Sequence, residues 1–204
     1  MAPSSQSRRL PPKIDAEEIR LIRLSQQGDQ AAFEELVRRH QPKVFSIIAN
    51  VLRDRREVED IAQQVFVKLY FSLPGFRFRS TLSTWLYRIT VNECYDYLRK
   101  QRARPLTTAA DLTEADTQRL ERLEDERAAT GLSEAEHLEL KEFVTKLLQG
   151  LSPEERILMT LKELEGLSIE EIASVTAMNE NTVKVKLFRA RAKLAKALGG
   201  KRPG

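Results

Sequence analysis

Hydrophobic residues recur at helical spacing through most of this 204-residue chain, and no segment shows a convincing alternation of apolar and polar positions. Residues 31–52 and 57–73 each carry one apolar stripe. The first stripe consists of Phe33, Leu36, Val37, Val44, Ile47, Ile48 and Val51, and the second of Val58, Ile61, Val65 and Leu69. Such stripes are typical of amphipathic helices that pack on a shared core. The pattern therefore predicts an all-α fold.

Several helix boundaries are chemically marked in the first half of the chain. Asp29 follows Gly28 and suits the start of the first striped helix, within which Pro42 is expected to introduce a bend. Pro74 and Gly75 are expected to end the second helix. Residues 76–104 begin with serine and threonine start signals and continue as a basic helix that contains aromatic residues.

The second half has the sharper local signals. Residues 152–155 (SPEE) and 168–171 (SIEE) are two capping boxes, and Gly166 is expected to end the helix between them. A brief connection then leads to Asn179, a good N-cap for a long basic helix. A short helix, a tight turn and a longer basic helix predict a helix-turn-helix, whose second helix enters the major groove of DNA.

Helical projection divides the last helix into an inner and an outer face. Val183, Leu187, Ala190 and Leu194 share the face expected to pack inward, whereas Asn181, Val185 and Arg189 lie opposite. Arginine can bond guanine bidentately, asparagine can pair with adenine, and flanking lysines suit phosphates. The alternative is an ordinary exposed helix that carries lysines for solubility.

Charge is unevenly distributed, although the net value is only +4. Residues 1–105 carry 19 basic and 12 acidic side chains, residues 106–142 carry 4 and 11, and residues 143–204 carry 11 and 7. The middle block has few large apolar residues, which predicts a flexible acidic linker. It is either a solvated spacer or a polyanion-like segment for a positively charged channel.

Composition also excludes several classes of protein. No apolar run is long enough to cross a bilayer, and the basic N-terminus lacks an apolar stretch behind it, so we expect a cytoplasmic protein without membrane insertion. Cys94, His40 and His137 form no spaced cluster, so neither a metal nor a cofactor is implied. No phosphate loop or nucleophile-base pair stands out, which argues against an enzyme. We therefore assign no catalytic residue. We expect Cys94 to be a packed residue rather than a redox sensor.

Four motifs in order resemble those of bacterial RNA polymerase sigma factors of the extracytoplasmic function (ECF) group of the sigma-70 family. They are GDQAAFEELVRRHQPKVF, EVEDIAQQVFVKLYFSLPGF, STWLYRITVNECYDYLRKQR and the helix-turn-helix segment that begins at LSPEER. The second contains the Asp-x-x-Gln-x-x-Phe pattern typical of the family's polymerase-binding helix. The resemblance implies a dissociable subunit that brings core RNA polymerase to promoter DNA, and it implies an anti-sigma protein as a further partner.

The resemblance also assigns residues to three contacts. Core polymerase would be bound by Asp60, Gln63, Gln64 and Phe66. The minus-ten element would be bound and melted by Phe76, Arg77, Arg79, Ser80, Thr81, Trp85, Arg88 and Asn92. The minus-thirty-five element would be read by Asn181, Thr182, Lys184, Val185, Lys186, Phe188, Arg189 and Arg191. For Phe66 and Trp85, packing in the core remains the alternative to these contacts. Gln64 stands where the family commonly has an acidic residue.

The expected organisation is two small helical domains joined by the acidic linker. An N-terminal extension (1–13) precedes sigma domain two (14–105), the linker (106–142), sigma domain four (143–199) and a tail (200–204). A stand-alone helix-turn-helix regulator is the competing function, because residues 150–198 alone satisfy that description. The polymerase-docking pattern in the first half favours the sigma factor.

Overall fold

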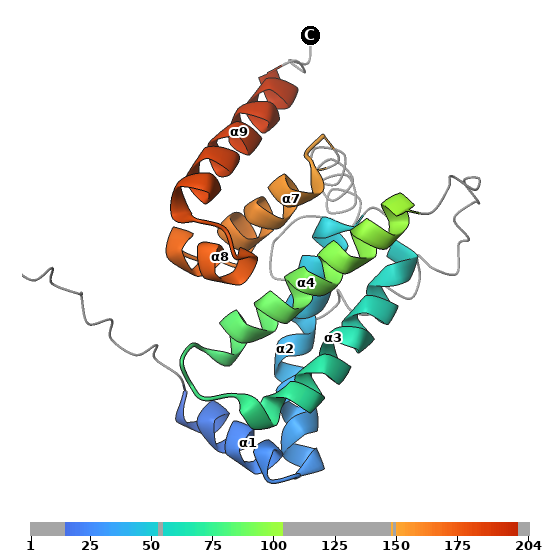
Figure 1. The fold of residues 1–204 in the computed structure, drawn as a ribbon, viewed down its shortest axis with the longest axis vertical. Helices are drawn as coiled ribbons and strands as arrows, with labels where there is room; N and C mark the ends of the chain where they lie inside the picture. The colour runs from blue at the N-terminus through green and yellow to red at the C-terminus, as the bar shows by residue number, and fades with distance from the viewer. Residues whose placement is uncertain (1–14, 53–54, 104–147, 149, 200–204) are drawn as a thin grey trace, which may run out of the picture.

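The computed structural model describes residues 15–52, 55–103, 148 and 150–199, and every regular element in these ranges is a helix (Figure 1). The all-α prediction is therefore confirmed. The predicted acidic linker and both predicted terminal extensions lie outside the described residues. No helix in the described ranges combines the length and the apolar character needed to span a membrane.

The first half is a bundle of α1 (Ala16–Gln26), α2 (Gln30–Val51), α3 (Val58–Ser72) and α4 (Leu82–Ala103). Short 3-10 turns, η1 (Arg55–Glu57) and η2 (Leu73–Gly75), flank α3. Gly28 has φ 94°, a left-handed conformation that glycine adopts without strain, and Asp29 then caps α2. The predicted stripes are largely confirmed, because their buried members include Leu36, Val44, Ile47, Ile48, Val51, Val58, Ile61, Val65 and Leu69.

The second half contains α7 (Pro153–Met159), a π-helical turn η4 (Thr160–Leu164), α8 (Ile169–Thr176) and α9 (Glu180–Gly199). Both predicted capping boxes form, each with the serine and glutamate side chains bonded to the other's backbone N–H. Ala177 adopts φ 55° at the turn between α8 and α9. The Asn179 side chain accepts a hydrogen bond from Thr182 N at 2.7 Å, which confirms the predicted N-cap.

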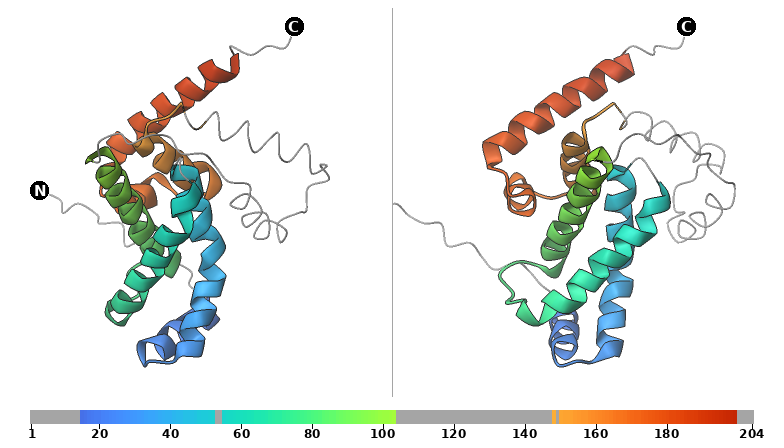
Figure 2. Two further views of the ribbon diagram at one scale, coloured as in Figure 1. Left: turned by 90° about the vertical axis from the view of Figure 1, so that its right-hand side faces the viewer. Right: turned by 45° about the vertical axis from the view of Figure 1, so that its right-hand side comes forward.

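The two halves pack directly on each other. Helix α8 lies along α4, and both α7 and η4 contact α2 (Figure 1; Figure 2). The buried apolar residues of both halves form one continuous cluster. Helix α9 lies on the outer side of this assembly, and Figure 2 shows it extending away from the four-helix bundle. One long face of α9 is consequently open to a large partner.

Candidate nucleic-acid interface

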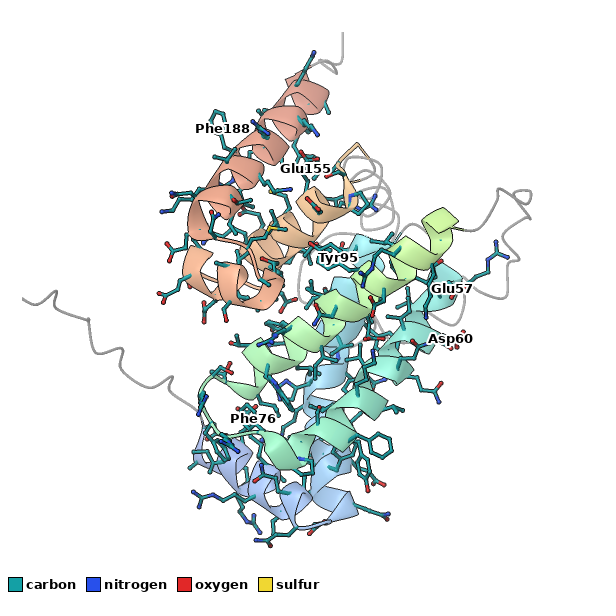
Figure 3. All side chains as sticks on the ribbon, in the orientation of Figure 1. Glu57, Asp60, Phe76, Tyr95, Glu155 and Phe188 are labelled. Carbon is teal, nitrogen blue, oxygen red and sulfur yellow. The ribbon has the colours of Figure 1, made fainter. Side chains whose placement is uncertain are left out.

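Helix α9 is anchored by one face and presents the other to solvent, as the sequence predicts. Val183, Leu187 and Ala190 are buried against α7 and α8. On the opposite side, Asn181, Val185 and Arg189 are exposed. Phe188 is 73% exposed and points away from α7 (Figure 3). A large exposed aromatic ring on a polar helix face is typical of an interaction surface.

The first three turns of α9 form an open hollow of about 760 Å³. Asn179, Glu180, Asn181, Thr182, Val185, Lys186 and Arg189 line it. The lining combines amide, hydroxyl, guanidinium and ammonium groups with one small apolar side chain and the Glu180 carboxylate. Amide and guanidinium groups are side chains that recognise the base edges of DNA. Five of the eight predicted minus-thirty-five residues are therefore brought together at one place.

Ion pairs divide the basic residues of this region into two groups. Lys186 bonds Glu154, Arg191 bonds Glu163 at 2.7 Å, and Lys193 bonds Glu155 at 2.7 Å, so these three cations fasten α9 to α7 and η4. Lys184 is 3.9 Å from Glu180 on its own helix. Within the described part of the chain, Arg189 has no acidic partner. Its guanidinium is thus the cation of the hollow that is open to a ligand.

Glu155 is the main anchor between α7 and α9. Its carboxylate accepts hydrogen bonds from Lys193 Nζ at 2.7 and 2.8 Å and from Ser152 N at 2.8 Å. Burial by itself raises the pKa of Glu155, but the bonds from Lys193 and Ser152 outweigh it, and the pKa lies below its usual range. The carboxylate therefore stays charged and holds the reading helix in place near neutral pH.

A second exposed surface runs along α3. Asp60, Gln63 and Gln64 are exposed at its N-terminal half, where Asp60 points outward (Figure 3). Phe66 is half-buried and packs against the core, so its position favours the packing alternative left open by the sequence. Asp60, Gln63 and Gln64 do not pack in the core, so their side chains are accessible to a partner.

Sequence reasoning missed the apolar continuation of this surface. Val67, Tyr70 and Phe71 are exposed on α3, and the Tyr70 ring contacts Phe33 and Phe71 edge-on at centroid distances of 5.0 and 5.5 Å. These positions follow Asp60 by seven, ten and eleven residues, which is helical spacing. A helical projection from Asp60, which the sequence analysis made only for the last helix, could have found them.

The loop before α4 carries the third surface. Arg77 and Arg79 on the loop, and Arg88 and Asn92 on α4, are exposed. Ser80 and Thr81 are half-buried, and Thr81 Oγ1 accepts a hydrogen bond from Thr84 N at 3.0 Å, which caps α4. Gln26 of α1 holds the loop in place by donating to the carbonyls of Leu73 and Phe76 at 3.0 Å.

An aromatic cluster supports this loop. Phe76 is only 7% exposed, and its ring lies 5.1 Å from those of Phe78 and Trp85. Phe78 has φ 56°, a strained left-handed conformation that no pattern in the sequence predicts. Trp85 is half-buried and packs on the core while part of its ring remains open. Phe76 is thus placed beneath the surface, and Trp85 is at its edge.

Comparisons with known proteins match both halves of the chain. Residues 36–104 match the family model of sigma-70 region 2, and residues 144–194 match that of sigma-70 region 4. The chain is 39% identical to the ECF RNA polymerase sigma-E factor of Escherichia coli (strain K12) over 175 residues, covering 84% of this chain and 88% of the relative. It is 36% identical to the RNA polymerase sigma-H factor of Pseudomonas aeruginosa over 182 residues, covering 87% and 92%.

Solved structures extend the likeness to the fold. The structure of CnrH in complex with the cytosolic domain of CnrY matches with a TM-score of 0.64 at 25% identity, covering 92% of this chain and all of that one. The sigma factor RpoE of Bartonella quintana, in complex with the anti-sigma factor NepR, matches with a TM-score of 0.61 at 21% identity, covering 83% and 98%. From the family models and the curated relatives together, we conclude that this chain belongs to the ECF group of the sigma-70 family.

Proposed function

We propose that this ECF sigma factor directs promoter recognition, DNA melting and transcription initiation through three separate surfaces. Helix α9 reads the minus-thirty-five element, the loop and outer side of α4 take the minus-ten element, and α3 docks on core RNA polymerase. The observation that carries the proposal is the hollow at the start of α9, which Arg189 lines together with Asn181 and Val185. Among the described residues, the Arg189 guanidinium has no acidic partner.

The chemistry of that hollow suits base edges in the major groove. The Arg189 guanidinium can donate two hydrogen bonds to guanine, and the Asn181 amide can pair with adenine. Val185 and the exposed Phe188 ring offer apolar contact to thymine methyl groups. Lys184 suits a phosphate, whereas Lys186 and Arg191 act mainly through their bonds to Glu154 and Glu163.

The minus-ten surface combines cations with a stacking edge. Arg77, Arg79 and Arg88 can hold the backbone of a separated strand, and the Asn92 amide can bond the Watson-Crick edge of a base. The open part of the Trp85 ring offers a stacking platform, and the buried Phe76 ring supports it from below. These groups stabilise an unpaired strand by binding alone, so the chain acts without catalysis of its own.

Docking on core polymerase uses the exposed stripe of α3. The polar half, with Asp60 and Gln63, orients α3 on the polymerase. The apolar half, with Val67, Tyr70 and Phe71, provides the apolar area that becomes buried on binding. Because bacterial core RNA polymerase works in the cytoplasm, the proposal implies the same location for this chain. The structural relatives are complexes with CnrY and with an anti-sigma factor, and we extend to this chain a protein partner of the same kind.

A pair of charge-matched variants tests the proposal. Arg189→Ala and Lys196→Ala each remove one exposed cation from α9, but only Arg189 lines the hollow. In run-off transcription with core polymerase, Arg189→Ala should lower the yield roughly tenfold or more, because a good bidentate base contact contributes about 1–3 kcal/mol. Lys196→Ala should stay near wild type. Equal yields from the two variants would refute the assignment of α9.

A further inference from the structure

One glutamine side chain of α1 bonds both ends of the η2 turn, which leads into the minus-ten loop (residues 76–81). Gln26 Nε2 donates to the carbonyl oxygens of Leu73 and Phe76, each at 3.0 Å. Both partners are acceptors, so the amide must present its nitrogen, whose two hydrogens suffice for the two bonds. The Leu73 oxygen also accepts from Phe76 N at 3.0 Å, which closes the turn. Gln26 therefore fixes the point at which the chain leaves α3 and enters the loop.

Helix α1 is a firm support for this amide. It lies at the foot of the bundle, next to η2 (Figure 1). Its Ile22 is fully buried in the core. Just after Gln26, Asp29 N donates to Leu24 O at 3.1 Å, which closes the C-terminal end of the helix. The amide is consequently anchored to the core independently of the loop.

The minus-ten loop has few other restraints of this kind. Among the described residues, its remaining hydrogen bonds join it only to itself, to η2 or to the first turn of α4. Phe78 nevertheless holds a left-handed conformation, and such strain persists only where the surrounding structure enforces it. The two bonds from Gln26 are contacts from outside the loop that help to enforce it.

The carbonyl that Gln26 holds belongs to the residue whose ring supports Trp85. The Phe76 ring lies 5.1 Å from the Trp85 ring, and the exposed Arg77 follows directly in the chain. A shift of the Phe76 backbone would therefore move the ring and Arg77 together. The stacking edge and the first cation of the minus-ten surface both depend on this bond from α1.

We propose that Gln26 is a positioning residue for promoter melting, which holds the minus-ten loop in the conformation that captures the separated strand. It acts through the loop rather than by contact with DNA. The inference rests on the proposed function, because it takes the loop as part of the minus-ten surface. A loop that is already ordered loses less conformational freedom when it binds a strand. Gln26 should therefore affect the melting step more than the initial binding of duplex promoter.

Matched glutamine variants of the full-length chain test the contact with the loop. Gln26→Met keeps the length of the side chain and removes its donor, and Gln27→Met makes the same change at the exposed neighbour. Trp85 is the only tryptophan in the sequence, so acrylamide quenching of its fluorescence reports the packing of the loop without DNA or polymerase. Gln26→Met should raise the quenching constant, and Gln27→Met should match wild type. Unchanged quenching in Gln26→Met would overturn the positioning of the loop.

Open-complex formation by the reconstituted holoenzyme tests the effect on melting. On a duplex promoter identified by run-off transcription, the rate at increasing holoenzyme concentration gives a maximal rate for melting and a half-saturating concentration for initial binding. Gln26→Met should lower the maximal rate roughly tenfold, the effect of one or two hydrogen bonds, and leave the half-saturating concentration within about twofold of wild type.

Two kinetic results would overturn the proposal. A raised half-saturating concentration with an unchanged maximal rate would mean only that less of the variant is folded. Stronger quenching with both kinetic values unchanged would separate the loop contact from melting. The quenching measurement judges the contact even if wild type yields no transcripts, an outcome that would instead count against the proposed function.

Discussion

Replacing Glu155 by alanine should destabilise the chain by about 2 kcal/mol, because this carboxylate serves two partners at once. It completes the capping box with Ser152 at the start of α7, and it accepts both hydrogen bonds from Lys193 of α9. The box contributes about 1 kcal/mol. The bonds to Lys193 contribute about another 1 kcal/mol. This contribution is kept small because solvent screens the ion pair: the lysine side chain is 53% exposed, although that of Glu155 is only 10% exposed.

The second capping box supplies a matched control. Glu171 makes the same reciprocal bonds with Ser168, and it has no lysine partner among the described residues. Glu171→Ala should therefore cost about 1 kcal/mol, which is the capping contribution alone. Urea unfolding followed by far-UV circular dichroism measures both variants. Equal losses for Glu155→Ala and Glu171→Ala would refute the anchoring of α9 through Lys193.

The pH dependence gives an independent check. Because the folded pKa of Glu155 is lowered, its charged form contributes stability above the ordinary glutamate pKa of about 4.3. That contribution is lost as pH falls through the lowered folded value. The difference in free energy of unfolding between wild type and Glu155→Gln should thus be largest at neutral pH and should shrink in acid. A difference that grows in acid would contradict the lowered pKa of Glu155.

Three further predictions follow from burial and exposure. Cys94 is fully buried with a pKa raised by burial to about 12, so a disulfide reagent should modify it far more slowly in the native chain than in urea; equal rates would place the thiol at the surface. Leu36→Ala should cost about 2–5 kcal/mol in urea unfolding, and a loss below about 1 kcal/mol would contradict its place in the core. Phe71→Ala, at a side chain 77% exposed, should leave stability within about 0.5 kcal/mol and weaken binding to core polymerase, as measured by competition; unchanged affinity would remove Phe71 from the docking stripe.

Local chemistry explains why so much of the fold could be predicted from the sequence. The capping boxes at Ser152 and Ser168, the Asn179 cap and the stops near Gly75 and Gly166 depend on residues within one helical turn. Helical projection then separated the buried Val183 and Leu187 from their exposed neighbours on the same helix.

The parts that sequence reasoning missed depend on contacts between distant segments. The Tyr87 hydroxyl donates a hydrogen bond to Glu165, 78 positions away, and neither residue lies in a pattern that predicts the other. The pairing of Lys186 with Glu154 likewise needs the packing angle of α7 against α9. The burial of Phe76 follows from the loop conformation at Phe78, which periodicity cannot supply. Residue types in the candidate site were therefore predictable, but their division into ligand contacts and internal anchors was not.

The most direct measurement is run-off transcription by purified bacterial core RNA polymerase, with and without this protein, on a pool of promoter DNA from its source genome. The account predicts discrete transcripts only when the protein is present, and a yield lowered roughly tenfold or more by Arg189→Ala. Transcripts that are the same with and without the protein, or DNA binding that never leads to initiation across the pool, would contradict it.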